Sequence, residues 1–171
     1  MRIQLPIIES FIDYPSEKGS CLTVFFTGCG FSCNGCHNTG LKKFEAEGSI
    51  DIKPIELYNL LLEESSRRRH TDKLVLQGGD PFFHKNFEGV IELLNINKFF
   101  DICIYTGYPI DFLKENNIKG FQFAKCGIYD ENLKQDSFKN SFVFSLASSN
   151  QNIYDKNYNQ MSENGILHFK E

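Results

Sequence analysis

Short segments typical of β-strands alternate with helical stretches along most of this chain. Strands are predicted where β-branched and aromatic residues gather, over residues 21–27, 73–77, 100–106, 121–125 and 142–146. Helices are predicted between them, over residues 54–68, 87–95 and 109–116, and the first opens with Pro54. A strand–helix–strand order at this spacing implies parallel strands joined by right-handed crossovers.

The length of the chain limits what this alternation can build. The chain has 171 residues, whereas a complete eight-fold βα barrel typically needs ~250. It can supply five or six strands, and a last short one is predicted over residues 166–169. We therefore expect an α/β fold, a partial and open TIM-like βα barrel of five to six mainly parallel strands, in a single domain spanning residues 1–171. Chemistry in such sheets gathers at the carboxyl ends of the strands.

The bulk composition excludes several classes of protein. Hydrophobic residues make up 41% of the chain and charged residues 23%, which is typical of a globular domain. The net charge of −4 supplies no basic face for nucleic acid, and the single basic run, residues 67–70, is interpreted as a cap at the carboxyl end of a helix. We see no targeting segment and no apolar run long enough to cross a membrane, so we expect a cytoplasmic protein.

Six cysteines in a chain without a secretion signal favour metal or redox chemistry over disulfides. Three of them, Cys29, Cys33 and Cys36, lie in a glycine-rich loop directly after the first predicted strand. The glycines at positions 28, 30 and 35 let the backbone wrap a bulky inorganic centre. Fe–S clusters usually take four thiolate ligands. Three local ligands would leave one iron of a cubane open to a small molecule.

Other interpretations of the cysteines stay open at this point. A structural zinc site prefers paired C-x2-C units and a fourth ligand, which His37 lies too close in sequence to supply comfortably. Cys21 and Cys103 fall inside predicted strands, where a free cysteine is usually a small buried hydrophobe. Cys126 follows the fourth predicted strand and is the one credible distant fourth ligand.

The spacing of Cys29, Cys33 and Cys36 after a first strand resembles that of the radical S-adenosylmethionine enzymes. The resemblance implies a [4Fe–4S] cluster whose open iron is chelated by the amino and carboxylate groups of S-adenosylmethionine. It also implies that one electron splits the sulfonium and yields a 5′-deoxyadenosyl radical. Many members carry an aromatic residue just before the third cysteine, where this chain has Gly35. Contact with adenine there would fall to backbone atoms and to His37.

A second motif, Gly78-Gly79-Asp80-Pro81, follows the second predicted strand. By itself such a turn is weak evidence, because turns in general favour these residues. Gly78 and Gly79 would let the chain approach a cationic amine without a Cβ in the way. Pro81 would fix the turn, while backbone carbonyls or the Asp80 carboxylate would supply acceptors. The motif resembles the family's glycine-rich turn that binds the methionine amino group, with Asp80 in place of the commoner Glu.

Several segments resemble, in the same order, those of the anaerobic ribonucleotide reductase activating enzymes, namely residues 25–29, 36–38, 77–81, 105–108, 127–133 and 148–151. The similarity covers most of the chain from about residue 11 to 155. Leu146-Ala147 departs from an expected Arg-Gly, and Cys126 occupies a position that is often acidic. Asn150 and Gln151 are interpreted either as turn residues or as hydrogen-bond partners of the cofactor.

The resemblance implies hydrogen abstraction from a glycine in the large subunit of anaerobic ribonucleotide reductase, with an electron donor such as flavodoxin or ferredoxin. An open barrel would admit the partner's loop. The resemblance further implies that the three cysteines hold the cluster and that the cofactor is bound by Gly35, His37, Asn38, Gly78, Gly79, Asp80, Pro81 and Thr106. Two other functions stay open: a small-molecule radical enzyme resembling the 7-carboxy-7-deazaguanine synthases, and a non-catalytic metal-binding module.

Overall fold

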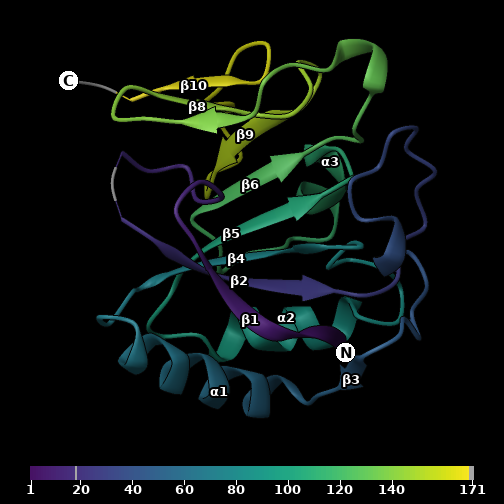
Figure 1. The fold of residues 1–171 in the computed structure, drawn as a ribbon, viewed down its shortest axis with the longest axis vertical. Helices are drawn as coiled ribbons and strands as arrows, with labels where there is room; N and C mark the ends of the chain where they lie inside the picture. Colours follow the sequence, from purple (N-terminus) through teal and green to yellow (C-terminus); the bar gives the residue numbers. More distant parts are fainter. Residues whose placement is uncertain (18, 170–171) are drawn as a thin grey trace.

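A seven-stranded sheet, with strand order β3-β1-β2-β4-β5-β6-β9, forms the centre of the molecule (Figure 1). The computed structural model describes residues 1–17 and 19–169. Four neighbouring strands run parallel to one another: β2 (Cys21–Phe26), β4 (Lys73–Gly78), β5 (Asp101–Thr106) and β6 (Phe123–Cys126). They correspond to the first four predicted strands, so the prediction of a parallel core is confirmed.

The strands that flank this parallel core join the sheet through antiparallel pairing, and β3, two such steps from β2, again runs in the direction of the core. β1 (Arg2–Ser10) pairs with β2 and carries β3 (Ser49–Asp51) on its outer side, while β9 (Asn152–Asp155) pairs with β6. The sequence did not predict these strands. Pro6 and a register shift between Gln4 and Ile8 interrupt the alternation of β1, and β9 lies in a polar, Asn-rich tail.

Among the described residues the central sheet is open, because its edge strands β3 and β9 do not pair with each other. The fold is therefore mixed α/β with a mainly parallel central sheet, and the expected TIM-like barrel is not confirmed. The predicted strand over 142–146 exists as β8 (Val143–Ser145), but it lies in a second, antiparallel sheet between β7 (Phe138–Lys139) and β10 (Ile166–His168). Only the short 3-10 helix η2 (Glu131–Leu133) separates β6 from β7, whereas a parallel strand requires a long crossover.

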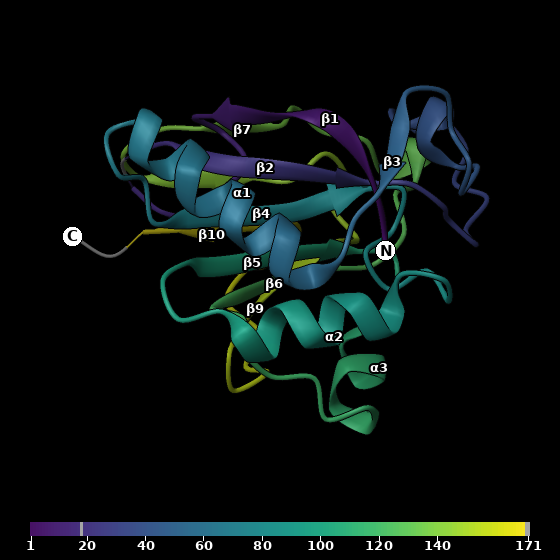
Figure 2. The ribbon, with the colours of Figure 1, turned by 90° about the horizontal axis from the view of Figure 1, so that it is seen from below.

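The predicted helices join the parallel strands. α1 (Pro54–Arg67) connects β3 to β4, α2 (Phe87–Ile96) connects β4 to β5, and α3 (Ile110–Glu115) connects β5 to β6. Pro54 begins α1, where its missing N–H costs no helical hydrogen bond. Figure 2 shows α1 and α2 lying across one face of the central sheet. None of the helices in the described part of the chain has the length and hydrophobicity of a membrane span.

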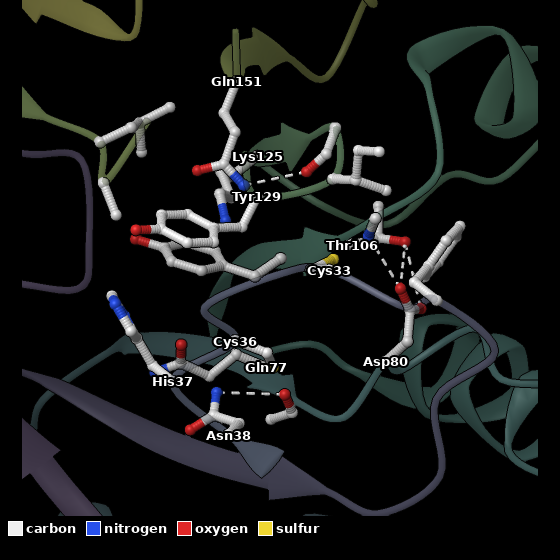
Figure 3. Close-up of a pocket in the computed structure, with 18 of the residues that line it drawn as sticks. Cys33, Cys36, His37, Asn38, Gln77, Asp80, Thr106, Lys125, Tyr129 and Gln151 are labelled. Atoms are coloured by element: carbon white, nitrogen blue, oxygen red, sulfur yellow. Dashed lines mark hydrogen bonds between the residues drawn. The ribbon is translucent and has the colours of Figure 1, made fainter. Parts of the chain in front are cut away.

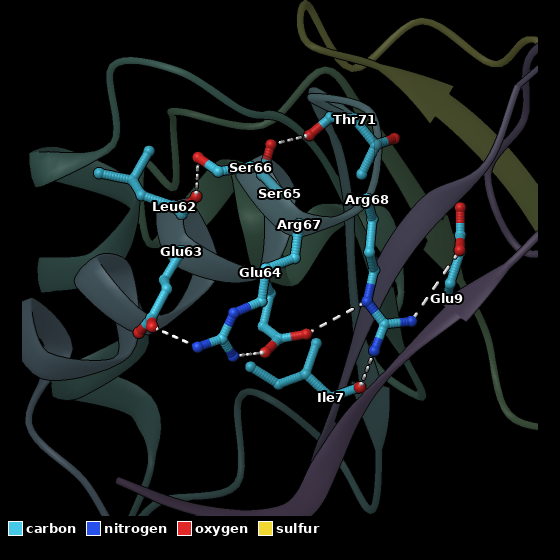
Figure 4. Close-up of polar contacts among 10 residues, drawn as sticks. All are labelled: Ile7, Glu9, Leu62, Glu63, Glu64, Ser65, Ser66, Arg67, Arg68 and Thr71. Atoms are coloured by element: carbon cyan, nitrogen blue, oxygen red, sulfur yellow. Dashed lines mark hydrogen bonds and ion pairs between the residues drawn. The ribbon is translucent and has the colours of Figure 1, made fainter.

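The basic run at residues 67–70 lies at the carboxyl end of α1, as predicted (Figure 4). Arg67 forms ion pairs with Glu63 and Glu64 on its own helix. Arg68 pairs with Glu64 and also reaches β1, where its guanidinium donates to the carbonyl of Ile7 and lies 3.9 Å from Glu9. Arg68 therefore fastens the end of α1 to the edge of the sheet.

The two faces of the parallel strands bury different sets of side chains. On the face beneath the helices, every second residue of the strands joins one large apolar core, including Leu22, Val24, Leu74, Leu76, Ile102, Ile104, Ala124 and Cys126. The other face carries a smaller cluster of Tyr14, Cys21, Val75 and Cys103, and the second sheet packs beside it on Tyr105 and Phe123. Cys21 and Cys103 are buried, as the sequence predicts.

Candidate functional site

A cavity of about 230 Å³ opens on the second face, at the carboxyl ends of the parallel strands (Figure 3). The loop after β2 supplies all three clustered cysteines to its wall, and the turn after β4 supplies Gly78, Gly79 and Asp80. β5 and β6 contribute Thr106 and Lys125 from their ends. This is the edge of the sheet at which parallel strands ordinarily assemble a site.

Backbone hydrogen bonds hold the cysteine loop in place. The N–H of Gly28 donates to the carbonyl of Leu41 at 2.8 Å, and the N–H of Cys29 donates to Lys42 at 3.0 Å. The N–H of Asp80 donates to the carbonyl of Gly28 at 2.8 Å. The loop is thus fixed both to its own return segment and to the turn after β4, so the two predicted motifs lie in contact.

The three cysteines are free thiols, partly buried, and they come from one wall of the cavity. The Sγ of Cys29 accepts a hydrogen bond from the N–H of Phe31 at 3.4 Å, while burial raises the pKa of Cys29. A set of soft thiolate donors around a cavity suits an iron–sulfur cluster. Within residues 1–17 and 19–169, no three His, Cys, Asp or Glu side chains gather closely enough to share a single metal ion.

Cys126 does not contribute to this wall. It is 3% exposed and packs in the apolar core beneath the helices, one residue out of phase with Lys125, which reaches the cavity. Burial raises the pKa of Cys126 to about 12. The interpretation of Cys126 as a fourth ligand therefore finds no support in the geometry.

The turn after β4 packs so tightly against the cysteine loop that it requires glycine. Gly78 has a φ of +116°, and a Cβ there would lie 2.6 Å from the carbonyl oxygen of Phe26. A Cβ on Gly79 would collide with the carbonyl of Gly28 and lie 2.8 Å from that of Leu41. The side-chain amide of Asn38 also donates to the carbonyl of Gly78 at 3.1 Å. These glycines therefore allow close backbone contact between the turn after β4 and the cysteine loop.

Asp80 ties the end of β4 to the end of β5. The carboxylate is 1% exposed and accepts hydrogen bonds from the N–H groups of Phe82 and Gly107, both at 2.8 Å. The hydroxyl of Thr106 donates to the same carboxylate at 2.9 Å and accepts from the N–H of Tyr108. Burial raises the pKa of Asp80 to about 6, against these hydrogen bonds, which lower it. The hydrogen bond between Asp80 and Thr106 thus joins the ends of the two strands.

Most of the predicted site residues line the one cavity. Those that do are Cys29, Cys33, Cys36, His37, Asn38, Gly78, Gly79, Asp80 and Thr106. Gly35 and Pro81 are not among its lining residues; Pro81 is buried behind the turn. Gly35 instead makes room for Glu131, whose carboxylate occupies the place that a Cβ at position 35 would take.

Lys125 and Tyr129 are among the residues of the cavity wall that sequence reasoning missed. The ammonium of Lys125 lies 5.1 Å from the centre of the Tyr105 ring, and burial lowers the pKa of Lys125 to about 8. Tyr129 follows β6, donates its hydroxyl to Glu131 and places its ring centre 5.1 Å from that of His37. A charged residue in an otherwise apolar strand was the available signal for Lys125, whereas Tyr129 was marked only by its place in the segment 127–133 that resembles the activating enzymes.

The chain belongs to the family of 4Fe–4S single cluster domains, whose model matches residues 17–154, and the three thiols in the cavity wall suit the iron–sulfur cluster of that family. It is similar to proteins named anaerobic ribonucleoside-triphosphate reductase-activating protein, as its sequence predicts. The relative from Pasteurella multocida is 28% identical over 150 residues, covering 82% of this chain and 93% of the relative. The relative from Haemophilus influenzae is 30% identical, over 58% of this chain and 68% of the relative. The relative from Enterobacteria phage T4 is 26% identical, over 71% of this chain and 78% of the relative. No solved structure matches the chain.

Proposed function

We propose that this chain is a radical S-adenosylmethionine activase that generates a glycyl radical on the large subunit of an anaerobic ribonucleotide reductase. One observation carries the proposal: Cys29, Cys33 and Cys36 face the same cavity as the glycine turn after β4. The names of the relatives support the choice of partner.

In this proposal the three cysteines hold a [4Fe–4S] cluster and leave one iron without a protein ligand. The methionine end of the cofactor lies beside the turn at Gly78 and Gly79. Because the Asp80 carboxylate is already engaged by Phe82, Thr106 and Gly107, backbone carbonyls supply the acceptors for the methionine ammonium.

Cys29, Cys33 and Cys36 would hold the cluster, which would supply the electron for cleavage of S-adenosylmethionine and so the chemistry that removes a hydrogen atom from the target glycine. The protein positions the reactants and excludes water. Phe31, Tyr105 and Phe144 line the cavity and limit the access of water to it. Lys125 adds a cation to the wall, which favours an anionic group of the ligand.

The partner's glycine must reach this cavity from outside. Ile128, whose side chain is exposed, and the partly buried Tyr129 both line the cavity, and a protein loop that enters beside Ile128 would meet both. We further propose that a flavodoxin or ferredoxin donates the electron and that the protein works in the cytoplasm, where its free thiols stay reduced.

An anaerobic assay tests the proposal. The protein is loaded with iron and sulfide, reduced, and given S-adenosylmethionine with or without the large reductase subunit; 5′-deoxyadenosine and the EPR spectrum are then measured. A glycyl doublet that needs the subunit supports the activase. Deoxyadenosine without a protein radical would redirect the assignment to a small-molecule enzyme or another partner. No cleavage by a verified four-iron cluster would leave a metal-binding module.

A further inference from the structure

The side-chain carbonyl of Gln151, in the cavity wall, has no hydrogen-bond partner among the residues that the structure describes. The residue is 1% exposed, and its Nε2 donates to the carbonyl of Gly127 at 2.9 Å. That hydrogen bond fixes which end of the amide faces the cavity, because the carbonyl of Gly127 can only accept. Oε1 is therefore a buried acceptor without a donor. Buried polar atoms are rarely left unsatisfied, so a ligand's donor is the natural complement.

Gln151 lies at the far side of the cavity from the glycine turn. It directly precedes β9, which pairs with β6, whereas the turn follows β4. The two are three strand positions apart in the sheet, roughly 14 Å at about 4.8 Å per strand. A ligand whose one end lies at the glycine turn must therefore be elongated to reach Gln151 with its other end.

An aromatic wall adjoins this acceptor. The ring centres of Tyr129 and His37 lie 5.1 Å apart with their planes tilted by 47°, so a flat ligand ring can stack on only one of the two. The hydroxyl of Tyr129 is held by Glu131 in the space that Gly35 leaves. The loop that carries Tyr129 is held by Gln151 through the carbonyl of Gly127, and by Asn150 through the carbonyl of Ile128 at 2.9 Å. Figure 3 shows Gln151 and Tyr129 directed toward the same cavity.

We propose that Gln151 accepts a hydrogen bond from the exocyclic amino group of adenine, and that the ring of Tyr129 provides the surface on which the base stacks. The inference rests on the proposed function, which places the methionine ammonium at the glycine turn. At the other end of S-adenosylmethionine the donors are the ribose hydroxyls and the adenine amino group. An aromatic wall beside the acceptor selects the base, because nucleobases stack on aromatic side chains.

An internal donor is the competing explanation. Lys125 lies in the neighbouring strand, and its ammonium could turn from the Tyr105 ring to Oε1 of Gln151. In that case Gln151 would hold a lysine and would contribute nothing to the choice of base. The two explanations therefore differ in which residue the preference for adenine depends on, Gln151 or Lys125.

Equilibrium binding separates these explanations without relying on turnover. S-adenosylhomocysteine and its hypoxanthine counterpart, S-inosylhomocysteine, are titrated by calorimetry into the cluster-loaded protein under anaerobic conditions. Hypoxanthine presents a carbonyl where adenine presents an amino group, so it offers Oε1 an acceptor. We expect the wild type to prefer the adenine ligand by at least about tenfold, and Gln151→Met to abolish most of that preference.

Matched variants isolate the acceptor from the loop. Gln151→Glu and Gln151→Met both lose the donor to Gly127, but only the glutamate keeps an acceptor, so Gln151→Glu should retain the adenine preference. Asn150→Leu removes the neighbouring loop contact, and Lys125→Met removes the internal donor; both should also retain it. Iron content and circular dichroism establish that each variant is loaded and folded.

The outcomes are decisive in each direction. An unchanged adenine preference in Gln151→Met overturns the inference, as does an equal loss in Gln151→Met and Gln151→Glu, which would mean that Gln151 only positions the loop. A preference that disappears in Lys125→Met overturns it in favour of the internal pair. A wild type that binds neither ligand overturns the proposed function itself, and is distinguished from the other outcomes by the absence of any binding.

Discussion

The two faces of the parallel strands carry out different tasks. On β6, Ala124 and Cys126 point beneath the helices and join the large apolar core, whereas Phe123 and Lys125 point to the opposite face, where Lys125 reaches the cavity. Because side chains alternate along a strand, one position separates a core residue from a residue in the site. The helix face stabilises the fold, and the cavity face carries the proposed chemistry.

This comparison explains why cysteines of one chain have different roles. Cys126 lies close in space to the cavity, yet its position on the strand directs it into the core. Cys36 lies in a loop beyond the strand end, where alternation no longer applies, and it lines the cavity. The following predictions test whether function and stability separate in this way.

The largest effect is expected for Cys36→Ala. We expect this variant to lose the cluster and all cleavage of S-adenosylmethionine, because the proposed site has no spare thiolate. Iron and sulfide per chain after anaerobic reconstitution measure the loss. Cys126→Ala is the matched control: it should bind a full cluster while its free energy of unfolding falls by about 1 kcal/mol. Loss of the cluster in Cys126→Ala would contradict the assignment of stability to the helix face and of cluster binding to the cavity face.

Asp80 is a residue of the cavity edge whose main role we expect to be structural. Asp80→Ala leaves the N–H groups of Phe82 and Gly107 without their acceptor, so the free energy of unfolding should fall by about 3 kcal/mol. Asp51→Ala removes an exposed carboxylate that forms an ion pair with Arg2 and should cost less than about 1 kcal/mol. Urea unfolding measures the loss of unfolding free energy in both variants. An equal loss in Asp80→Ala and Asp51→Ala would contradict the structural role of Asp80.

The same carboxylate predicts a pH dependence. Burial raises the pKa of Asp80 in the folded protein from 3.8 to about 6, so between those values the folded state binds the proton more tightly than the unfolded state. The stability that Asp80 contributes is therefore highest below pH about 4 and declines as the pH rises to about 6, by about 1.4 kcal/mol per pH unit. The free energy of unfolding should be measured for cluster-free wild type and Asp80→Asn across this pH range. As the pH rises, the free energy of unfolding of the wild type should fall relative to that of Asp80→Asn. A constant difference would place the pKa of Asp80 near its ordinary value.

A moderate effect is expected at the turn after β4. Gly79→Ala forces a Cβ against the backbone carbonyls of Gly28 and Leu41, which cannot move without shifting the cysteine loop. We expect a loss of about 1–3 kcal/mol in unfolding free energy and weaker cluster binding. Gly40→Ala lies in the same loop region with no atom within 4 Å of the added Cβ, so it should be neutral. Thermal unfolding together with iron content measures both variants.

The smallest effects are expected on the outer surface of the helix layer. Arg68→Ala removes the contacts that join α1 to Glu9 and Ile7 of β1 and should cost about 1 kcal/mol. Arg67 is 61% exposed and, within the described part of the chain, forms its ion pairs inside its own helix, so Arg67→Ala should cost a few tenths of a kcal/mol. Neither change should alter cluster content. An equal cost for the two arginines, measured in guanidinium, would show that the link to β1 contributes nothing.

Part of the fold could be predicted because its signals are local. β2, β4, β5 and β6 are short apolar segments between glycine turns or helices, and α1 begins at Pro54. The strands β1 and β9 carry no such signal, since their pairing depends on partners distant in the sequence. The expected barrel was not found for a related reason: the described segment between β6 and β8 contains no long helical crossover, so β8 forms a second sheet.

The site divides in the same way. The sequence by itself determined the three-cysteine loop and the glycine turn, because ligand type, spacing and backbone freedom are properties of consecutive residues. Only the tertiary structure decided that Cys126 faces the core, that Asp80 is bound by Thr106, and that Glu131 occupies the space beside Gly35. It also brought Tyr129 against His37 and left Gln151 with an unsatisfied carbonyl. Such contacts depend on which strand lies beside which and on the face that each residue takes, and the packing of the whole chain sets both.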